Sequence, residues 1–92
     1  MIRSFRDSDT ENLFKDVRVA RHRNIERVAR RKLLVLDAAK VLGDLKVPPG
    51  NRLEGLQGSR QGQHSIRIND QFRLCFVWKD GEAFDVEVTD YH

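Results

Sequence analysis

The sequence predicts an α+β fold in the order β-α-α-β-β-β, with two N-terminal helices packed on one face of a small antiparallel sheet. Two observations predict it. Residues 8–42 carry two stretches in which apolar residues recur with helical spacing, and residues 62–89 alternate apolar and polar residues as half-buried strands do. Short polar turns separate the alternating runs, so consecutive strands should pair as hairpins.

The composition is that of a globular chain of 92 residues with a net charge of +3. We expect one domain over residues 1–92. No apolar run is long enough for a membrane span and no signal peptide is present, so we expect a cytoplasmic protein. The one cysteine, Cys75, excludes an internal disulfide. Residues 1–61 carry fourteen Lys and Arg against eight Asp and Glu, so a polyanion or acidic partner would prefer this part.

The first elements are a short strand over residues 1–6 and a helix after it. Ser8 followed by Glu11 is a capping-box pattern, which predicts a helix from about Asp9 to about Arg18. Its buried residues should be Leu13, Phe14 and Val17.

A second, longer helix is predicted from a cap at Asn24 to about Leu42. Leu34, Ala38 and Val41 form a second apolar stripe on the far side, either covered by the first helix or exposed to a partner. Outward-facing arginines are either a solvated helix face or a polyanion contact. The inward arc contains Ile25, Val28, Ala29, Leu33, Val35, Leu36, Ala39 and Leu42, with Lys32 inside it, and the outward arginines are Arg27, Arg30 and Arg31.

Residues 46–61 should be irregular, because Pro48 and Pro49 cannot continue a helix. Leu53 and Leu56 anchor a short extended piece there, and glycines make the following loop pliable. Their spacing is not that of a phosphate-binding loop.

The register of the next hairpin follows from its apolar face. A three-residue loop pairs Ile66 with Leu74, whereas a two-residue loop would mix the two faces. The three-residue loop places Arg67 directly opposite Arg73 on the face away from the core, where like charges disfavour the sheet. These arginines are either solvated or the binding site of an anion.

The last strand should place the C-terminus beside these arginines. A three-residue loop, Asp80 to Glu82, would pair Trp78 with Phe84 and Leu74 with Val88, and would leave Phe72 opposite Asp90. The ending Asp90, Tyr91 and His92 then brings a carboxylate, a phenol and an imidazole near two guanidinium groups.

These groups suit phosphodiester cleavage by an RNA 2′-hydroxyl without a metal. The three histidines are scattered, so no metal site is expected; His64 is interpreted as structural and His22 as solvated. Cys75 has no neighbouring histidine and is an unlikely nucleophile. Arginines stabilise the charge on the phosphorane, while a base and an acid serve the attacking hydroxyl and the leaving oxygen.

Three stretches carry a resemblance to a known family: Pro48–Glu54 (PPGNRLE), Gly58–Arg73 (GSRQGQHSIRINDQFR) and the ending Asp90, Tyr91 and His92. They resemble the HigB toxins, the plasmid-maintenance killer branch of the RelE/ParE superfamily. Length, element order and the terminal triplet match over essentially the whole chain.

The resemblance implies a ribosome-dependent endoribonuclease that cuts mRNA in the small-subunit decoding site without a cofactor, neutralised by a HigA-type helix-turn-helix antitoxin. Arg73 would stabilise the scissile phosphate and Arg67 would bind phosphate. Asp90, Tyr91 and His92 would supply positioning and acid-base chemistry. We expect further RNA contacts from Arg60, Arg27, Arg30 and Arg31.

The sequence departs from the family at the general base. Some members have histidine where this chain has Glu54, and a lysine near Gln57 is missing. The base is therefore either Glu54 or a C-terminal group. Phe72 stands where tryptophan is common, which changes packing and not the reacting groups.

Two other functions compete with RNA cleavage. One is an RNA or ribosome binder that blocks translation without cutting, and new mRNA ends would separate it from a nuclease. The other is the gyrase-poisoning ParE branch, which the complete terminal triplet disfavours.

Overall fold

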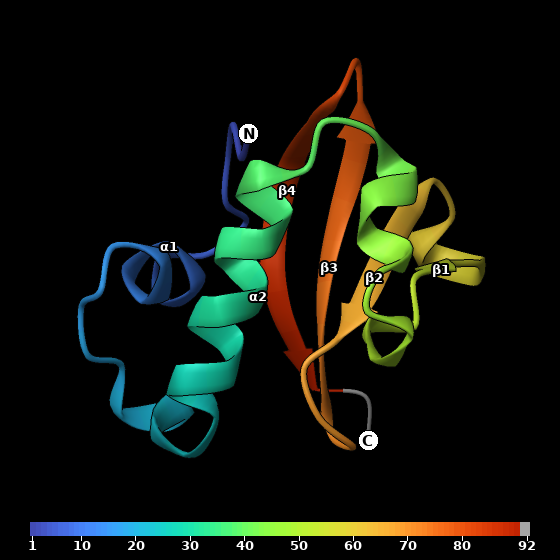
Figure 1. Cartoon of the computed structure of the whole chain (residues 1–92). Coiled ribbons are helices and arrows are strands. Elements are labelled where there is room, and N and C mark those ends of the chain that lie inside the picture. The colour runs from blue at the N-terminus through green and yellow to red at the C-terminus, as the bar shows by residue number, and fades with distance from the viewer. Residues whose placement is uncertain (91–92) are drawn as a thin grey trace.

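The computed structural model describes residues 1–90 of the chain. Within them, four antiparallel strands form one sheet in the order β1-β2-β3-β4. Helix α2 covers one face, and α1 packs against α2 and β4 (Figure 1). The predicted α+β fold is confirmed. The elements are α1 (Ser8–Phe14), η1 (Ala20–Ile25), α2 (Glu26–Ala38), η2 (Leu42–Lys46), η3 (Pro49–Asn51), β1 (Glu54–Gly55), η4 (Gly58–Arg60), β2 (Gln63–Arg67), β3 (Phe72–Lys79) and β4 (Glu82–Asp90).

The predicted N-terminal strand is reduced to two isolated parallel bridges along β4. They join Ile2 to Ala83 and Phe5 to Val86. Between them β4 bulges, and the Ser4 hydroxyl accepts the Asp85 N–H at 2.9 Å. At the bulge the Ser4 side chain, and not a backbone carbonyl, accepts the hydrogen bond from β4. The N-terminal segment is therefore not a continuous strand.

Helix α1 and its cap each lie one residue earlier than predicted. Asp7 is the N-cap, with its carboxylate accepting the Thr10 N–H at 2.6 Å, and Ser8 is the first helical residue. Aspartate and serine are similarly favoured N-cap residues, so the capping-box pattern does not decide between these two positions. The helix ends at Phe14, and Val17 is exposed beyond it, so its predicted burial is wrong. The Thr10 hydroxyl also accepts the Val88 N–H at 3.0 Å, which ties α1 to β4.

Helix α2 is bounded differently from its prediction, although its inward face is as expected. It begins after a 3-10 turn with Ile25 as N-cap, so Asn24 is not the cap, and it ends at Ala38. Ala29, Leu33 and Leu36 are buried against the sheet. The second apolar stripe is not covered by α1: Leu34 is 55% exposed, and Ala38 and Val41 are exposed as well.

The β2–β3 register is confirmed. Ile66 pairs with Leu74, and Arg67 lies opposite Arg73. The alternation of apolar residues therefore located both arginines on the sheet face opposite Ile66 and Leu74.

The predicted three-residue β3–β4 loop is wrong, because the turn has two residues, Asp80 and Gly81. Lys79 pairs with Glu82 and Trp78 with Ala83, not with Phe84. Asp-Gly is favoured in two-residue turns because both residues reach positive φ, and Gly81 has a φ of 78°. A bulge beside Asp85, whose φ is 53°, restores the predicted pairs of Leu74 with Val88 and Phe72 with Asp90.

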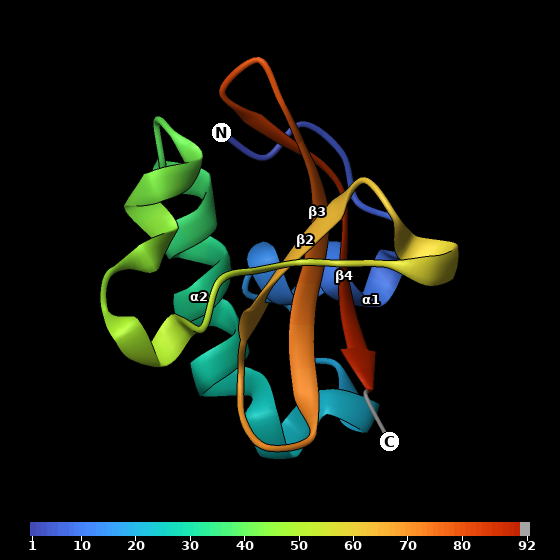
Figure 2. The ribbon, with the colours of Figure 1, turned by 90° about the vertical axis from the view of Figure 1, so that its right-hand side faces the viewer.

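The core lies between α2 and the sheet and is closed by η2. Seen from the side, α2 and the turns after it lie on one side of the sheet and η4 on the other (Figure 2). None of the helices within residues 1–90 has the length and apolar character needed to cross a membrane. The fully buried large side chains include Phe76, Leu13, Leu33, Leu36, Leu45, Ile66, Leu74 and Val86.

His22 is part of this core, so its predicted solvation is wrong. Its side chain is 3% exposed, and its ring meets that of Phe72 edge to face with centroids 5.9 Å apart. Burial lowers the pKa of His22, and the neighbouring Arg21 lowers it further, against a smaller opposing effect of Asp9 and Asp7. Burial in this core therefore favours the neutral imidazole.

Replacing the helix cap tests the boundary of α1. Asp7→Ala should lower the free energy of unfolding by about 1–2 kcal/mol, because the Thr10 N–H loses its acceptor. Ser8→Ala, at the neighbouring position, should change it by less than about 0.5 kcal/mol. Urea denaturation measures both, and a larger loss for Ser8→Ala would restore the serine as the cap.

Mild acid should destabilise the fold through His22. Because the folded-state pKa lies below its ordinary value of 6.5, the unfolded chain binds the proton more readily. Stability from this group is thus fully present above pH 6.5 and falls as the pH drops from there through the folded pKa. His22→Leu should flatten the stability profile over that interval. An unchanged slope in urea titrations would assign the pH dependence to other groups.

Candidate active site

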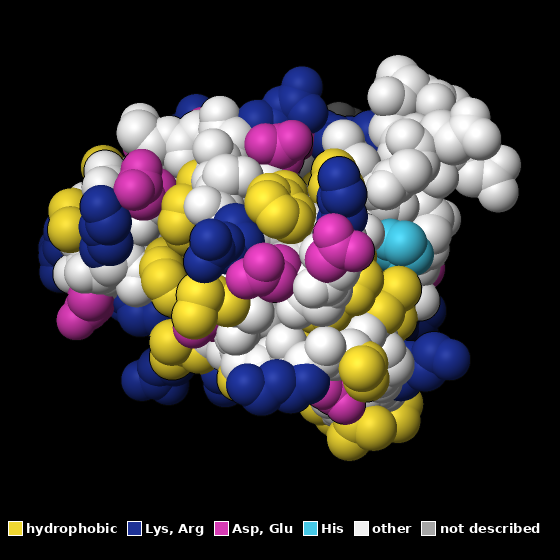
Figure 3. All heavy atoms as spheres, turned by 90° about the horizontal axis from the view of Figure 1, so that it is seen from above, with side chains coloured by type: hydrophobic (Ala, Val, Ile, Leu, Met, Phe, Trp, Pro, Cys, Tyr) yellow, Lys and Arg dark blue, Asp and Glu magenta, His cyan; other side chains and the backbone are white. Residues whose placement is uncertain are grey.

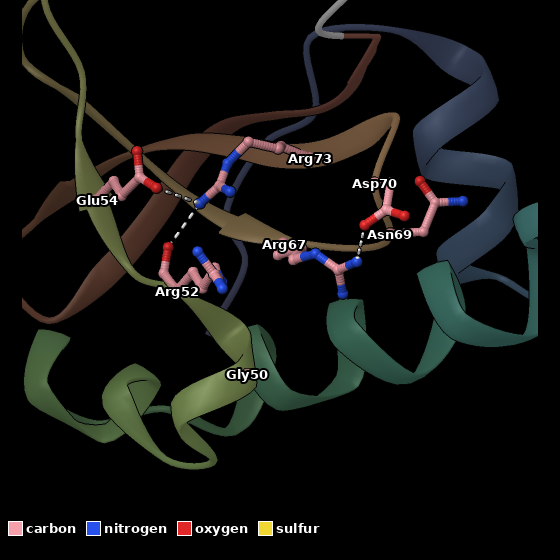
Figure 4. A pocket seen from close by; sticks show the side chains of 7 residues that line it. All are labelled: Gly50, Arg52, Glu54, Arg67, Asn69, Asp70 and Arg73. Atoms are coloured by element: carbon pink, nitrogen blue, oxygen red, sulfur yellow. Dashed lines mark hydrogen bonds and ion pairs between the residues drawn. The ribbon is translucent and has the colours of Figure 1, made fainter.

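A pocket of about 620 Å³ opens beside the β2–β3 hairpin. Residues from η3, β1 and the hairpin surround it (Figure 4). The lining residues are Gly50, Arg52, Glu54, Arg67, Asn69, Asp70 and Arg73.

The strand register brings the charged residues of the pocket together. Arg67 and Arg73 face each other across β2 and β3, and Glu54 lies on β1 opposite Ser65 of β2. Residues at alternate positions share one face of a sheet, so Ser65, Arg67 and Arg73 lie on the same side. The η3 turn, β1 and the β2–β3 hairpin, which are separate in the sequence, thereby line one pocket.

Each of the two opposed arginines has a carboxylate partner. Arg73 lies 3.6 Å from Glu54, and Arg67 forms an ion pair with Asp70 in the hairpin loop. These pairs offset the repulsion between the two facing cations. With Arg52, the pocket holds three guanidinium groups against two carboxylates, so it keeps an excess of positive charge.

Arg73 is the most constrained of these side chains and is 11% exposed. Its Nε donates to the Ser65 hydroxyl at 2.7 Å. Its Nη2 donates to the backbone oxygen of Arg52 at 2.5 Å and, at 3.4 Å, to that of Ser65. Sequence reasoning missed Ser65 and Arg52. The alternation of side chains could have placed Ser65 on the arginine face. No sequence pattern predicts the contact between Arg73 and the Arg52 carbonyl.

Lys32 adds positive charge behind the pocket. It points from α2 to Asn51, with which it forms a hydrogen bond. Burial lowers the pKa of Lys32, and the nearby charges of Arg31 and Arg67 lower it further. The amine is thus close enough to Arg67 for the two charges to interact.

Of the predicted terminal triplet, Asp90 is the part that lies among the described residues. It is exposed at the end of β4 opposite Phe72, and its carboxylate accepts a hydrogen bond from Gln71 at 2.9 Å. β3 separates it from β2, so it does not line the pocket. Tyr91 and His92 lie outside the described residues.

Arg60 lies apart from the pocket. It pairs with Glu87 at 2.7 Å and donates to the Gln63 carboxamide at 3.0 Å. These contacts attach η4 to β2 and β4.

The helix arginines divide into two kinds. Arg27 and Arg31 are exposed beside a hollow of about 450 Å³ that Leu34 also lines. Arg30 does not face outward as predicted: it is 22% exposed, and its Nε donates to the Leu13 carbonyl at 2.9 Å. An arginine side chain can cap a helix C-terminus by donating hydrogen bonds to the last free carbonyls, and Arg30 caps α1 in this way.

His64 lies on the core side of β2, with its ring stacked on Phe76 at 6.3 Å between centroids, as the structural interpretation expected. Within residues 1–90, no three His, Cys, Asp or Glu side chains gather where they could hold a metal ion. On the face seen in Figure 3, basic, acidic and hydrophobic side chains are interspersed without a large area of one charge.

Comparisons with known proteins all point to one family. A family model described as the RelE-like toxin of type II toxin-antitoxin system HigB matches residues 3–92. The chain is 45% identical to Toxin HigB-1 of Vibrio cholerae serotype O1 over 89 residues, which cover 92% of each chain. It is 29% identical to Endoribonuclease HigB of Proteus vulgaris over the full length of both chains.

Two solved structures share the fold. YafQ from E. coli strain BL21(DE3) has a TM-score of 0.63 at 14% identity, with 99% of this chain and 94% of that chain covered. A chain of the YoeB–YefM complex from Staphylococcus aureus has a TM-score of 0.57 at 18% identity, with 100% and 98% covered.

Removing the carboxylate of Asp70 should open the pocket to anions. Its side chain is 99% exposed, so its pair with Arg67 is weak, and Asp70→Asn should raise the affinity for inorganic pyrophosphate roughly two- to fivefold. Asp80→Asn makes the same charge change in the distant β3–β4 turn and should leave the affinity unchanged. An equal gain for both variants, measured by NMR titration, would show a general charge effect.

Proposed function

The chain belongs to the HigB-like toxins, which are RelE-like toxins of type II toxin–antitoxin systems, and from this we propose that it is an endoribonuclease that cuts mRNA on the ribosome. The observation that carries the proposal is the facing pair of Arg67 and Arg73 in a pocket that also holds Glu54. A relative along the full chain is named an endoribonuclease.

The proposed reaction uses the RNA's own 2′-hydroxyl as nucleophile and needs no metal ion. A base removes the hydroxyl proton, the oxygen attacks the adjacent phosphorus, and an acid donates a proton to the departing 5′-oxygen. The products are a 2′,3′-cyclic phosphate and a 5′-hydroxyl. Negative charge builds on the phosphorane oxygens, and fixed guanidinium groups stabilise it.

The pocket supplies candidates for each role. Arg73 would meet the scissile phosphate, and Arg67, on the neighbouring strand, would hold a phosphate beside it. Glu54 is 56% exposed and lies 3.6 Å from Arg73, so its carboxylate could take the hydroxyl proton of an RNA whose phosphate meets the same guanidinium. A C-terminal group is the other candidate base.

The C-terminal triplet is proposed to act from the far side of the hairpin. The contact of Asp90 with Gln71 keeps the end of β4 close to the β2–β3 loop. From there Asp90 would orient the substrate, and Tyr91 and His92 would supply proton transfer.

The basic first half of the chain would bind macromolecular partners. The region from Arg18 to Arg31 is proposed to contact ribosomal RNA or a HigA-type helix-turn-helix antitoxin, with Arg27 and Arg31 as its exposed charges. The solved YoeB–YefM complex supports an antitoxin partner for a chain of this fold. Arg60 would contact the RNA backbone from η4. A ribosomal target implies a cytoplasmic location.

A second candidate is a binder that blocks the ribosome without cutting RNA. The observation in its favour is that Arg67 and Arg73 already have carboxylate partners, which leaves fewer free donors for a transition state.

Arginine removal tests the nuclease directly. In a reconstituted translation mixture with a defined mRNA, the wild type should create new mRNA ends by primer extension only when ribosomes are present. Arg73→Ala should lower the cleavage rate roughly 10²–10³-fold, because one charge-stabilising donor is lost.

Lys79→Ala is the matched control, since it removes one positive charge from the opposite end of β3. Full cleavage by a folded Arg73→Ala protein would remove Arg73 from the mechanism. Arrested translation without new ends in the wild type would make the chain a non-cutting ribosome binder.

A further inference from the structure

Building on the proposed role of Arg73, we propose that Ser65 and the Arg52 carbonyl are positioning groups. They fix one edge of the Arg73 guanidinium and leave its Nη1 amine to contact the scissile phosphate. Nε and Nη2 make all the hydrogen bonds of this guanidinium to described residues, and Nη1 makes none.

Ser65 holds Arg73 from the sheet. It is fully buried in β2, and both its hydroxyl and its backbone oxygen accept hydrogen bonds from Arg73. Since its neighbour in β1 is Glu54, the same position also fixes the spacing between the two charged groups. A serine fits here because its short side chain ends within 2.7 Å of Nε.

The Arg52 carbonyl holds the same edge of Arg73 from the end of the η3 turn. Arg52 has a φ of 47° and a ψ of 58°, in the left-handed region, and its N–H donates to the Pro49 carbonyl at 3.1 Å. A residue other than glycine keeps this conformation only where the surrounding structure imposes it. The turn thereby aims a backbone oxygen at Nη2, 2.5 Å away.

Asn51 supplies that support. Its buried carboxamide donates to the carbonyls of Leu45 at 3.2 Å and Val47 at 3.3 Å, and accepts from Lys32 of α2. Its N–H donates to the Pro48 carbonyl at 2.9 Å. The loop that ends at Arg52 is therefore fastened to the core through one side chain.

This arrangement gives the guanidinium a fixed direction before substrate arrives. Arginine has a long flexible stem, and a held fork does not need to be ordered during the reaction. The expected effect of loosening it is therefore on the rate of cleavage and not on the binding of the RNA–ribosome complex.

Ser65→Ala tests the sheet side of the contact. The single-turnover rate should fall about tenfold while the ribosome concentration for half-maximal rate stays unchanged. Thr89→Val is the matched control: Thr89 lies opposite Arg73 on β4, and its buried hydroxyl has no hydrogen-bond partner among the described residues. It should cleave at the wild-type rate.

Testing Ser65→Ala in an Arg73→Lys protein separates a role of Ser65 in positioning Arg73 from a role in packing alone. Lysine has no Nε–H donor to serve Ser65, so Ser65→Ala should cause no further loss in an Arg73→Lys protein. An equal tenfold loss in both backgrounds, or a wild-type rate for Ser65→Ala, would overturn the inference.

NMR gives a readout that does not depend on activity. In the wild type the two Nη signals of Arg73 should be distinct, because the Arg52 carbonyl slows rotation about the Nε–Cζ bond. They should merge in Asn51→Asp, which keeps the acceptor for Lys32 but loses both donors to the loop. Distinct signals in a folded Asn51→Asp protein would overturn the role of the loop.

The two proposals fail in different ways. If Arg73→Lys cleaves at the full rate while the NMR signals behave as expected, the guanidinium is held but is not catalytic. If Arg73→Lys is impaired and Ser65→Ala is not, the nuclease proposal stands and the positioning inference falls.

Discussion

The structure depends on one pairing, in which Ile66 of β2 lies opposite Leu74 of β3. Because side chains alternate across a strand, this pairing puts the apolar residues against α2 and sends Arg67 and Arg73 together to the other face. A shift of either strand by one residue would turn its arginine toward the core. The hydrophobic effect that builds the core therefore also assembles the charged site, and neither can change register without the other.

This coupling explains which features could be predicted. Periodicity fixed the inward face of α2 and the β2–β3 register, since both depend on the burial of many apolar side chains. The Asp80–Gly81 turn was not predicted because the matching of apolar faces favours a three-residue loop, whereas the chain combines a two-residue turn with matched faces by placing Asp85 in a bulge. The C-terminal partners of the site, Tyr91 and His92, rest on sequence alone.

Polar contacts over long chain distances were the least predictable. Arg30 looks like its neighbours Arg27 and Arg31 in the sequence, yet it turns inward to bond the Leu13 carbonyl. His22 sits in a basic stretch that resembles a solvated linker, yet the ring of Phe72 covers it. In both cases the deciding partner is a single group brought close by the fold, for which residue type carries no signal. The same holds for the Arg52 carbonyl that meets Arg73.

The pairing of Arg67 and Arg73 with acidic side chains bears on which molecules the site would admit in a cell. An incoming anion at either arginine meets a charge that Glu54 or Asp70 already partly neutralises, and full engagement of the guanidinium requires exchange with that carboxylate. Free nucleotides and inorganic phosphate have few other contacts to offset that exchange. A nucleic acid strand already anchored elsewhere delivers its phosphate at high effective concentration. The acidic partners thus act as a filter, screening the site from the abundant small phosphates that any cell contains.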